Sequence, residues 1–188
     1  MPTETGIFNE EETNDQYSFS YPIARWIGKF LPKDEQVIDF GCGRASYLAY
    51  LQDIGFQYLL GVEGEQQHFE IHNDNIIIQD LTKPFDLNIY GNVICLEVGE
   101  HIPKDLWHLF IENISIHIPK GGKFIYSHGI REQGGLGHIN CMDNILVVYE
   151  LHQFGFALQT DESVFARDII GKECSWFKHS IMIFEKIK

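Results

Sequence analysis

The stretch that most constrains this chain runs from Val37 to Ala45, with the sequence VIDFGCGRA. Apolar residues and an acid lead into a glycine-rich turn, and a helical pattern follows at once, which predicts a strand, a tight loop and a helix N-terminus. Glu63 ends the next apolar run, 24 residues after Asp39. An acid at that position can accept hydrogen bonds from both hydroxyls of a ribose. The two features together predict a cofactor that contains a nucleoside.

Strand-like and helix-like segments alternate along the rest of the chain. Strands are predicted at residues 36–40, 57–63, 75–79, 92–97 and 123–127, and helices at 22–31, 45–54, 66–71, 103–118 and 140–155. This alternation predicts an α/β fold of the Rossmann-like, doubly wound type, with a mostly parallel sheet and helices on both faces. Asn140 is predicted to cap the helix that Gly155 ends. The last strand-like segments, 156–165 and 176–186, show no helix between them and are predicted to form a C-terminal antiparallel hairpin.

The length of 188 residues fits one domain with a substantial core. Residues 1–16 are polar and acidic, so we expect a flexible N-terminal arm there and a single domain over residues 17–188. The alternative for the arm is a lid that orders over a ligand. Its aromatic anchors would be Tyr17, Phe19 and Tyr21.

The formal charge of −13, with no Lys/Arg cluster longer than a pair, argues against nucleic acid as a partner because such binding needs a positive surface. No apolar run is long enough to span a bilayer, and the first residues lack a signal peptide, so we expect no membrane insertion. The four cysteines are scattered without a CxxC pair. We therefore expect them to be reduced in a cytoplasmic protein.

Five segments, in order, resemble the motifs of class I S-adenosylmethionine-dependent methyltransferases over about residues 20–187. They are VIDFGCG at 37–43, Glu63, QDL at 79–81, LEVGEHI at 96–102 and IPKGGKF at 118–124. The resemblance implies S-adenosylmethionine as cofactor and a seven-stranded sheet. It also implies a set of residues that hold the cofactor: Asp39, Gly41, Cys42, Gly43, Glu63, Asp80, Leu81 and Glu97.

The residue types agree with this resemblance. The Gly-x-Gly-x-x-Gly pattern of nicotinamide enzymes is incomplete because position 46 is Ser, and no Gly-Lys-Ser/Thr follows the turn as in a P-loop. A sulfonium cofactor needs no phosphate cradle, and Asp39 can neutralise or orient its positive end. The chain departs from the family pattern at Ala45, which replaces a glycine but is small enough to pack similarly. It departs again at Asn92, where an Asp often begins the fourth strand.

The segment from Glu97 to His101, EVGEH, allows two interpretations. The same Glu-x-x-Glu-His pattern provides metal ligands in ubiquinone-biosynthesis O-methyltransferases and small-RNA 2′-O-methyltransferases. This resemblance implies Mg²⁺ or Mn²⁺ at Glu97, Glu100 and His101, which could bind and acidify a substrate hydroxyl. The fourth ligand would be His128 or His138. In the alternative, no metal binds, Glu97 lines the cofactor pocket, and His101 packs or caps a helix.

The segment GGLGHIN, residues 134–140, follows the fifth predicted strand. It resembles a segment in a subgroup of small bacterial and viral methyltransferases, in a region where the superfamily places substrate-facing residues. His138 could there remove a proton from an attacking hydroxyl, since the imidazole pKa suits that role near neutral pH. His128 and His101 are further candidates for the base. In the alternative, the glycines simply form a turn and His138 hydrogen-bonds the backbone.

We therefore expect methyl transfer to a small-molecule acceptor, at oxygen, with a histidine as base. Two other functions stay open. A metal-dependent RNA 2′-O-methyltransferase is disfavoured by the acidity and by the absence of an added RNA-binding module. A non-catalytic cofactor-binding protein is disfavoured by the intact segment 134–140. The sequence predicts neither the identity of the acceptor nor the oligomeric state.

Overall fold

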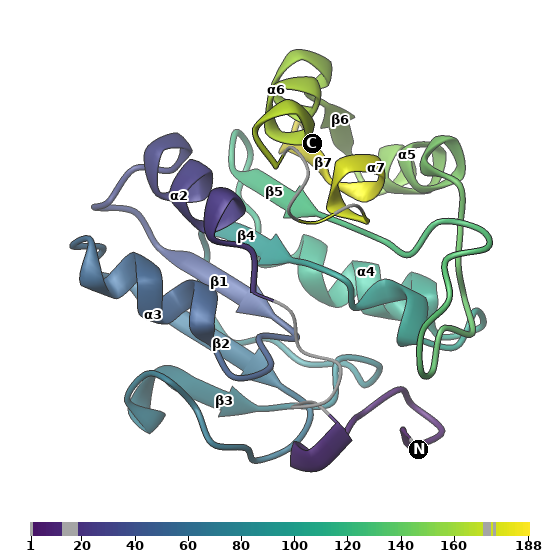
Figure 1. Ribbon diagram of the computed structural model, residues 1–188, viewed down its shortest axis with the longest axis horizontal. Helices are drawn as coiled ribbons and strands as arrows, with labels where there is room; N and C mark the ends of the chain where they lie inside the picture. The colour runs from purple at the N-terminus through teal and green to yellow at the C-terminus, as the bar shows by residue number, and fades with distance from the viewer. Residues whose placement is uncertain (1, 13–18, 171–173, 175) are drawn as a thin grey trace.

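The computed structural model of the chain describes residues 2–12, 19–170, 174 and 176–188. A seven-stranded sheet with the order β3-β2-β1-β4-β5-β7-β6 runs through its centre (Figure 1). The strands β1 to β5 are parallel, and β7 is antiparallel to both β5 and β6. The strands are β1 Val37–Phe40, β2 Leu59–Glu63, β3 Ile76–Ile78, β4 Asn92–Cys95, β5 Lys123–Tyr126, β6 Phe156–Leu158 and β7 Met182–Lys186. The predicted Rossmann-like fold is confirmed.

Helices cover both faces of the sheet (Figure 1). The helical segments are α2 Tyr21–Phe30, α3 Ser46–Asp53, η1 Asn73–Asn75, η2 Gly99–His101, α4 Trp107–Ser115, α5 Asn144–Gln153, α6 Thr160–Ile170 and α7 Phe177–Ser180. Their buried residues fall into two apolar clusters. One cluster joins α2, α3, α6 and α7 on one face, and the other joins α4 and α5 on the opposite face. No helix in the described ranges is long and apolar enough to cross a membrane.

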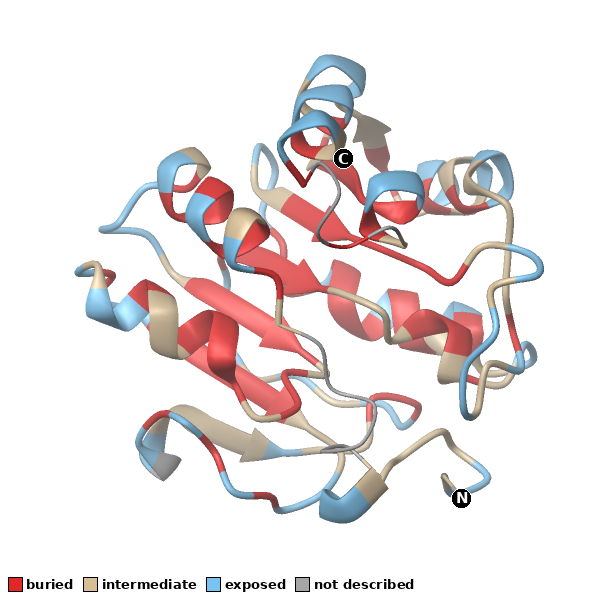
Figure 2. Cartoon of the chain, in the orientation of Figure 1, coloured by how far each residue is buried: buried red, intermediate tan, exposed pale blue. Residues whose placement is uncertain are grey.

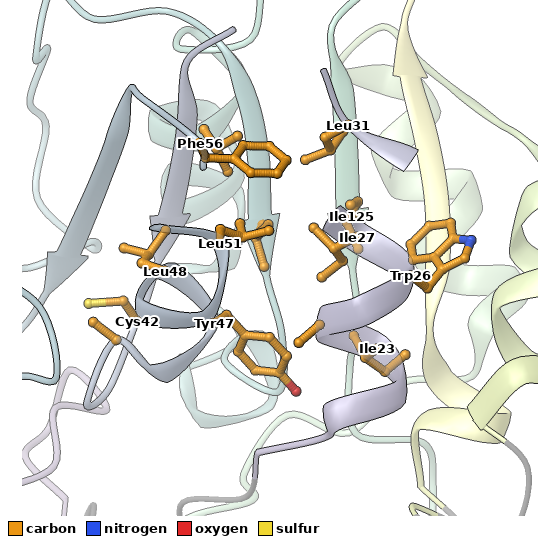
Figure 3. Close-up of a cluster of buried hydrophobic side chains, with 14 of the residues drawn as sticks. Ile23, Trp26, Ile27, Leu31, Cys42, Tyr47, Leu48, Leu51, Phe56 and Ile125 are labelled. Atoms are coloured by element: carbon orange, nitrogen blue, oxygen red, sulfur yellow. The ribbon is translucent and has the colours of Figure 1, made fainter. Parts of the chain in front are cut away.

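Period-two side-chain geometry explains how the strands serve both clusters. In β1, Val37 packs in the first cluster, whereas Ile38 and Phe40 pack in the second. Residues of β1, β2, β4, β5 and β7 are accordingly mostly buried, whereas the edge strands β3 and β6 and the outer helix faces are more exposed (Figure 2). In the first cluster, side chains of α2 such as Ile27 face those of α3 such as Leu51 (Figure 3). The sheet is therefore fixed between two apolar layers, and its strand ends are rigid positions for a site.

The C-terminal region departs from the predicted hairpin. The antiparallel pairing of β6 with β7 is confirmed, but the prediction that no helix separates them is wrong, because α6 and α7 lie between them. Strand β6 ends at Leu158, and Asp161 and Glu162 occupy the first turn of α6, where acids favour a helix N-terminus. The buried residues Ser163, Ala166 and Ile170 follow a helical spacing.

One further predicted helix and two predicted helix starts are wrong. Residues 66–71 form no helix, because Gln67, Phe69 and Ile71 are buried in alternation with exposed neighbours, as in extended chain. Helix α4 begins at Trp107 rather than at Pro103. Helix α5 begins at Asn144, so Asp143 occupies the N-cap position that was predicted for Asn140, and it makes no side-chain cap hydrogen bond.

Candidate active site

A cavity of about 390 Å³ lies at the carboxyl ends of β1, β2 and β4. The strand order reverses between β1 and β4, and open α/β sheets bind ligands at such a switch point. The cavity is within the size range of small-molecule sites, roughly 300–1,000 Å³. One end is lined by residues predicted to hold the cofactor, namely Asp39, Gly41, Cys42, Gly43 and Glu63.

The loop after β1 depends on backbone that glycine adopts easily. Gly41 has φ of +73°, and a β-carbon there would lie 2.5 Å from Cγ2 of Val98. Gly43 has φ of +53°. Ala45 also adopts a left-handed conformation, with φ of +62°, and its methyl group is fully buried. Alanine thus packs where the family pattern has glycine, but in a conformation that costs a non-glycine residue roughly 1–2 kcal/mol.

The carboxylate of Glu63 joins the first loop to the end of β2. Its Oε2 accepts the N–H of Gly43 at 2.7 Å, and its Oε1 accepts the N–H of Gly64 at 2.8 Å. Burial raises the pKa of Glu63, while these backbone N–H groups act in the opposite direction. The side chain therefore fixes the loop and still lines the cavity.

Asp39 is 3% exposed, in the middle of the sheet, and lines the same cavity. Burial, reinforced by the charge of Glu63, raises the pKa of Asp39 to about 8. The carboxyl group is consequently protonated at neutral pH when no ligand is present.

Asp80 and Leu81 do not line this cavity in the described structure. One carboxylate oxygen of Asp80, Oδ1, accepts the N–H of Thr82 at 2.9 Å and its hydroxyl at 2.6 Å, and Oδ2 lies 3.4 Å from Nζ of Lys83. Leu81 packs in the core. The side chain of Asp80 thus closes its own turn. A contact of this segment with the cofactor stays a prediction.

Glu97 connects three segments of the chain at the wall of the cavity. It has φ of +54°, and its N–H donates to Oγ of Ser127 at 2.8 Å. Its Oε1 accepts the hydroxyl of Ser180 at 3.1 Å, and its Oε2 accepts Nε2–H of Gln133 at 2.8 Å. The carboxylate therefore ties the end of β4 to the loop after β5 and to α7. No motif in the sequence marks Gln133 or Ser180.

Glu100, His101 and His138 form a cluster in which one ligand atom from each lies within 4.8 Å of the others. Glu100 is fully buried, and neither carboxylate oxygen has a hydrogen-bond partner among the described residues. Burial, followed by the charge of Glu97, raises the pKa of Glu100 well above its ordinary value. Of the predicted metal ligands, the cluster contains Glu100 and His101 but not Glu97.

His101 and His138 both line the cavity, with ring centroids 4.9 Å apart. Nδ1–H of His101 donates to the carbonyl of Gly137 at 3.2 Å, which leaves Nε2 with the lone pair. Burial and the neighbouring His138 lower the pKa of His101 to about 4. A β-carbon on Gly135 would collide with the His138 ring. Glycine at 135 is therefore required for the observed position of His138.

His128 lies beneath this cluster and has no exposed surface. Its Nε2–H donates to the carbonyl of Asn140 at 2.6 Å, and its Nδ1 accepts the hydroxyl of Tyr126 at 2.7 Å. Burial lowers its pKa to about 4. With both ring nitrogens bonded and no place in the lining of the cavity, His128 supports the loop of residues 127–143 from below.

Residues 2–10 contact the cavity from outside. The ring of Phe8 packs edge-on against His101, with centroids 4.7 Å apart, and Phe8 and Gly6 line the cavity. A β-carbon on Gly64 would lie 2.7 Å from Ile7, and the N–H of His68 donates to Glu10 at 3.0 Å. A β-carbon on Gly137 would lie 2.8 Å from Pro2, so the segment of residues 2–10 also lies near the loop that follows β5 (Figure 1). Of the predicted anchors, Phe19 packs on Tyr47 and Tyr21 on Tyr50, and Tyr17 lies outside the described residues.

Comparison with known proteins decides the family. A family profile described as "Methyltransferase domain" matches residues 14–132, which is more than half of the chain. The chain belongs to the S-adenosylmethionine-dependent methyltransferases. This confirms the resemblance seen in the sequence and identifies the protein as an enzyme that uses S-adenosylmethionine as methyl donor. No curated protein matches the sequence.

Solved structures show the same fold at low sequence identity. The sugar N-methyltransferase KedS8 from Streptoalloteichus sp. has a TM-score of 0.69 and 13% identity, with 91% of this chain and 89% of that chain covered. The 1,6-didemethyltoxoflavin N1-methyltransferase from Burkholderia thailandensis was solved with S-adenosylhomocysteine. It has a TM-score of 0.64 and 14% identity, with 90% of this chain and 78% of that chain covered. A complex of the Haloferax volcanii activator Trm112 with a putative methyltransferase has a TM-score of 0.66 and 14% identity, with 90% of this chain and 91% of that chain covered.

The cavity of this methyltransferase fits the cofactor. Gly41 and Gly43 line it with left-handed backbone and no side chain, and Glu63 lies at the strand tip where an acid can accept ribose hydroxyls. The carboxyl group of Asp39 lies in the same lining and has the chemistry to pair with the positively charged end of the cofactor. Leu96, Glu97 and Val98, which follow β4, line the same cavity.

Proposed function

We propose that this methyltransferase transfers a methyl group to the hydroxyl oxygen of a small molecule, with His138 as the base. The observation that carries the proposal is the pair His101–His138 in the same cavity as the cofactor residues Asp39 and Glu63. Structural neighbours with named small-molecule acceptors support the substrate size. Because two of those names specify transfer to nitrogen, support for oxygen comes from the imidazole pair, since an alcohol needs a base more than an amine does.

The reaction needs alignment, exclusion of water and one proton transfer. When bound, S-adenosylmethionine would supply an electrophilic methyl group to a lone pair of the acceptor oxygen, and the electron pair of the broken S–C bond would remain on sulfur. The proton of the hydroxyl goes to the imidazole of His138. Gly135 leaves room for that ring. Glu97 accepts a hydrogen bond from Gln133 and so holds the loop that contains His138.

His138→Asn is expected to lower kcat by about 30- to 100-fold. This is a small effect for the loss of a general base, because His101 lies beside His138 and can accept the proton in its place. Affinity for S-adenosylhomocysteine should stay within about twofold, since the ring is at the acceptor end. Turnover is measured as S-adenosylhomocysteine formed with an acceptor found by a product-mass screen.

Gly135→Ala should lower kcat in the same direction by displacing the His138 ring. Its matched control is Gly134→Ala, because a β-carbon at 134 meets no atom within 4 Å. Full turnover by His138→Asn at saturating acceptor would eliminate this base. A loss by Gly134→Ala equal to that of Gly135→Ala would remove the steric argument.

A second candidate is a metal-assisted form of the same transfer, favoured by the cluster of Glu100, His101 and His138. The buried Glu100 carboxylate, for which the described residues supply no hydrogen-bond partner, lies beside two imidazoles and fits a divalent cation. Two nitrogen donors favour Mn²⁺ over Mg²⁺. When bound, such an ion would acidify the acceptor hydroxyl. In the competing arrangement no ion binds and Glu100 stays neutral, because burial and then the charge of Glu97 raise its pKa well above the ordinary value.

The metal is tested by thermal unfolding with and without Mn²⁺. Binding at 100 times the dissociation constant should raise the Tm of the wild type by about 5–10 °C. Glu100→Gln should abolish that shift, whereas Glu112→Gln, which removes an exposed acid on α4, should retain it. Absence of any shift in the wild type, with full turnover in chelator, would reject the metal and leave His138 as sole activator.

The division into an acidic arm, residues 1–16, and a domain, residues 17–188, remains a proposal. Contacts of Phe8 with His101 and of Glu10 with His68 support the lid alternative for the described part of the arm. Four free thiols are consistent with the proposed cytoplasmic location.

A further inference from the structure

Aromatic rings from two distant parts of the chain line the cavity that contains His101 and His138. Phe8 comes from the N-terminal segment, and Trp176 and Phe177 come from the start of α7. Phe8 contacts the ring of His101, and Trp176 contacts Phe177 at a centroid distance of 6.0 Å. Rings arranged around an open cavity favour a flat ligand, because aromatic pairs gain energy beyond the area that they bury.

The charges around the cavity have one sign. Glu63 and Glu97 line it, and no lysine or arginine does so in the part of the chain that the structure describes. The whole chain carries a formal charge of −13. A carboxylate or phosphate on the acceptor would therefore lose its water without gaining a cationic partner, which is costly. A cationic group would instead meet aromatic faces and acids.

We propose that the acceptor is a flat aromatic hydroxy compound, uncharged or cationic, that carries no carboxylate or phosphate near its reacting ring. This inference rests on the function proposed above and narrows it to a substrate class. The polar groups of the cavity support the same conclusion. Glu97 is held by Ser180 and Gln133, so aromatic surface and the two imidazoles are what the cavity offers to a ring.

Four probes with the same vicinal diol separate charge from flatness. They are catechol, dopamine, 3,4-dihydroxybenzoate and cis-cyclohexane-1,2-diol. Binding to the complex with S-adenosylhomocysteine is measured by calorimetry, and methyl transfer from S-adenosylmethionine by product mass. Catechol and dopamine should bind at least about tenfold more tightly than the anionic or the saturated probe.

Two variants assign the selectivity to named side chains. Trp176→Leu should weaken catechol binding about tenfold without changing the preference between charges, because it removes a ring and no charge. Glu97→Gln should reduce the preference for catechol over 3,4-dihydroxybenzoate by about tenfold, because it removes one negative charge at the cavity. Glu132→Gln is the control, since it removes an exposed acid of the same loop.

Tighter or equal binding of 3,4-dihydroxybenzoate or of cyclohexanediol would overturn the inference, as would failure of both catechol and dopamine to bind at millimolar concentration. Failure of the proposed function gives a different result. In that case S-adenosylhomocysteine does not bind, or the aromatic probes bind and no methyl group is found on oxygen.

Discussion

Glu63→Ala is expected to lower the affinity for S-adenosylhomocysteine by about 1,000-fold. The carboxylate would accept two hydroxyls of the ribose, and each charge-assisted hydrogen bond contributes about 1.5–3 kcal/mol. It also accepts the N–H groups of Gly43 and Gly64, so its removal leaves the glycine loop without its anchor. Two lost ribose contacts alone amount to roughly 3 kcal/mol or more, and loss of the anchor adds to this. Calorimetry measures the change directly.

Glu65→Ala is the matched control, because it removes the same charge from an exposed position two residues away. It should leave the affinity within about threefold of wild type. Glu63→Gln should fall between the two variants, since an amide keeps one acceptor oxygen but places an NH₂ group toward a backbone N–H. An affinity of Glu63→Ala close to that of Glu65→Ala would contradict the assignment of Glu63 to the ribose.

The cofactor half of the cavity was predictable because its signals are local. Asp39, Gly41 and Glu63 stand at or just after the ends of predicted strands, and parallel strands bring such ends to one edge of a sheet. The position of each residue at a predicted strand end was therefore enough to place its side chain at this edge of the sheet. Asp80 shows the limit of this reasoning. It stands near the end of β3 as predicted, but the next two residues, Leu81 and Thr82, form a turn that engages its carboxylate.

The surroundings of His101 and Glu97 could not be predicted in the same way, because their contacts join distant parts of the sequence. Phe8 reaches His101 from the N-terminal segment, and Ser180 reaches Glu97 across 83 residues. Glu97 has left-handed backbone, and its carboxylate accepts hydrogen bonds from Gln133 and Ser180. His128 had the same strand-end signal as a catalytic residue, and only the packing of Asn140 and Tyr126 reveals that it is enclosed.

The pH dependence of cofactor affinity is expected to be set by Asp39. Its pKa of about 8 in the free protein arises from burial and then from Glu63, and the nearby thiols of Cys42 and Cys95 are neutral because burial raises their pKa values further. The cationic amino group of the cofactor favours the carboxylate, so binding releases a proton. The ionised fraction rises from about 0.3% at pH 5.5 to about 50% at pH 8, so affinity for S-adenosylhomocysteine should rise by about 150-fold.

Asp39→Asn is the variant that isolates this group, because the ligand's own amino group titrates alike with both proteins. In wild type, the calorimetric enthalpy near pH 7 should vary with the ionisation enthalpy of the buffer by about one released proton, and in Asp39→Asn this dependence should vanish.

The stability of the two proteins without ligand tests the pKa of Asp39 independently. A carboxyl whose pKa is raised on folding binds its proton more tightly in the folded state, so its contribution to stability is lost as the pH rises from about 4 to 8. Asp39→Asn should therefore be more stable than wild type at pH 8, with the difference shrinking toward pH 5, while it binds the cofactor more weakly. Equal buffer dependence in the two proteins would show that Asp39 stays protonated in the complex and does not neutralise the cofactor.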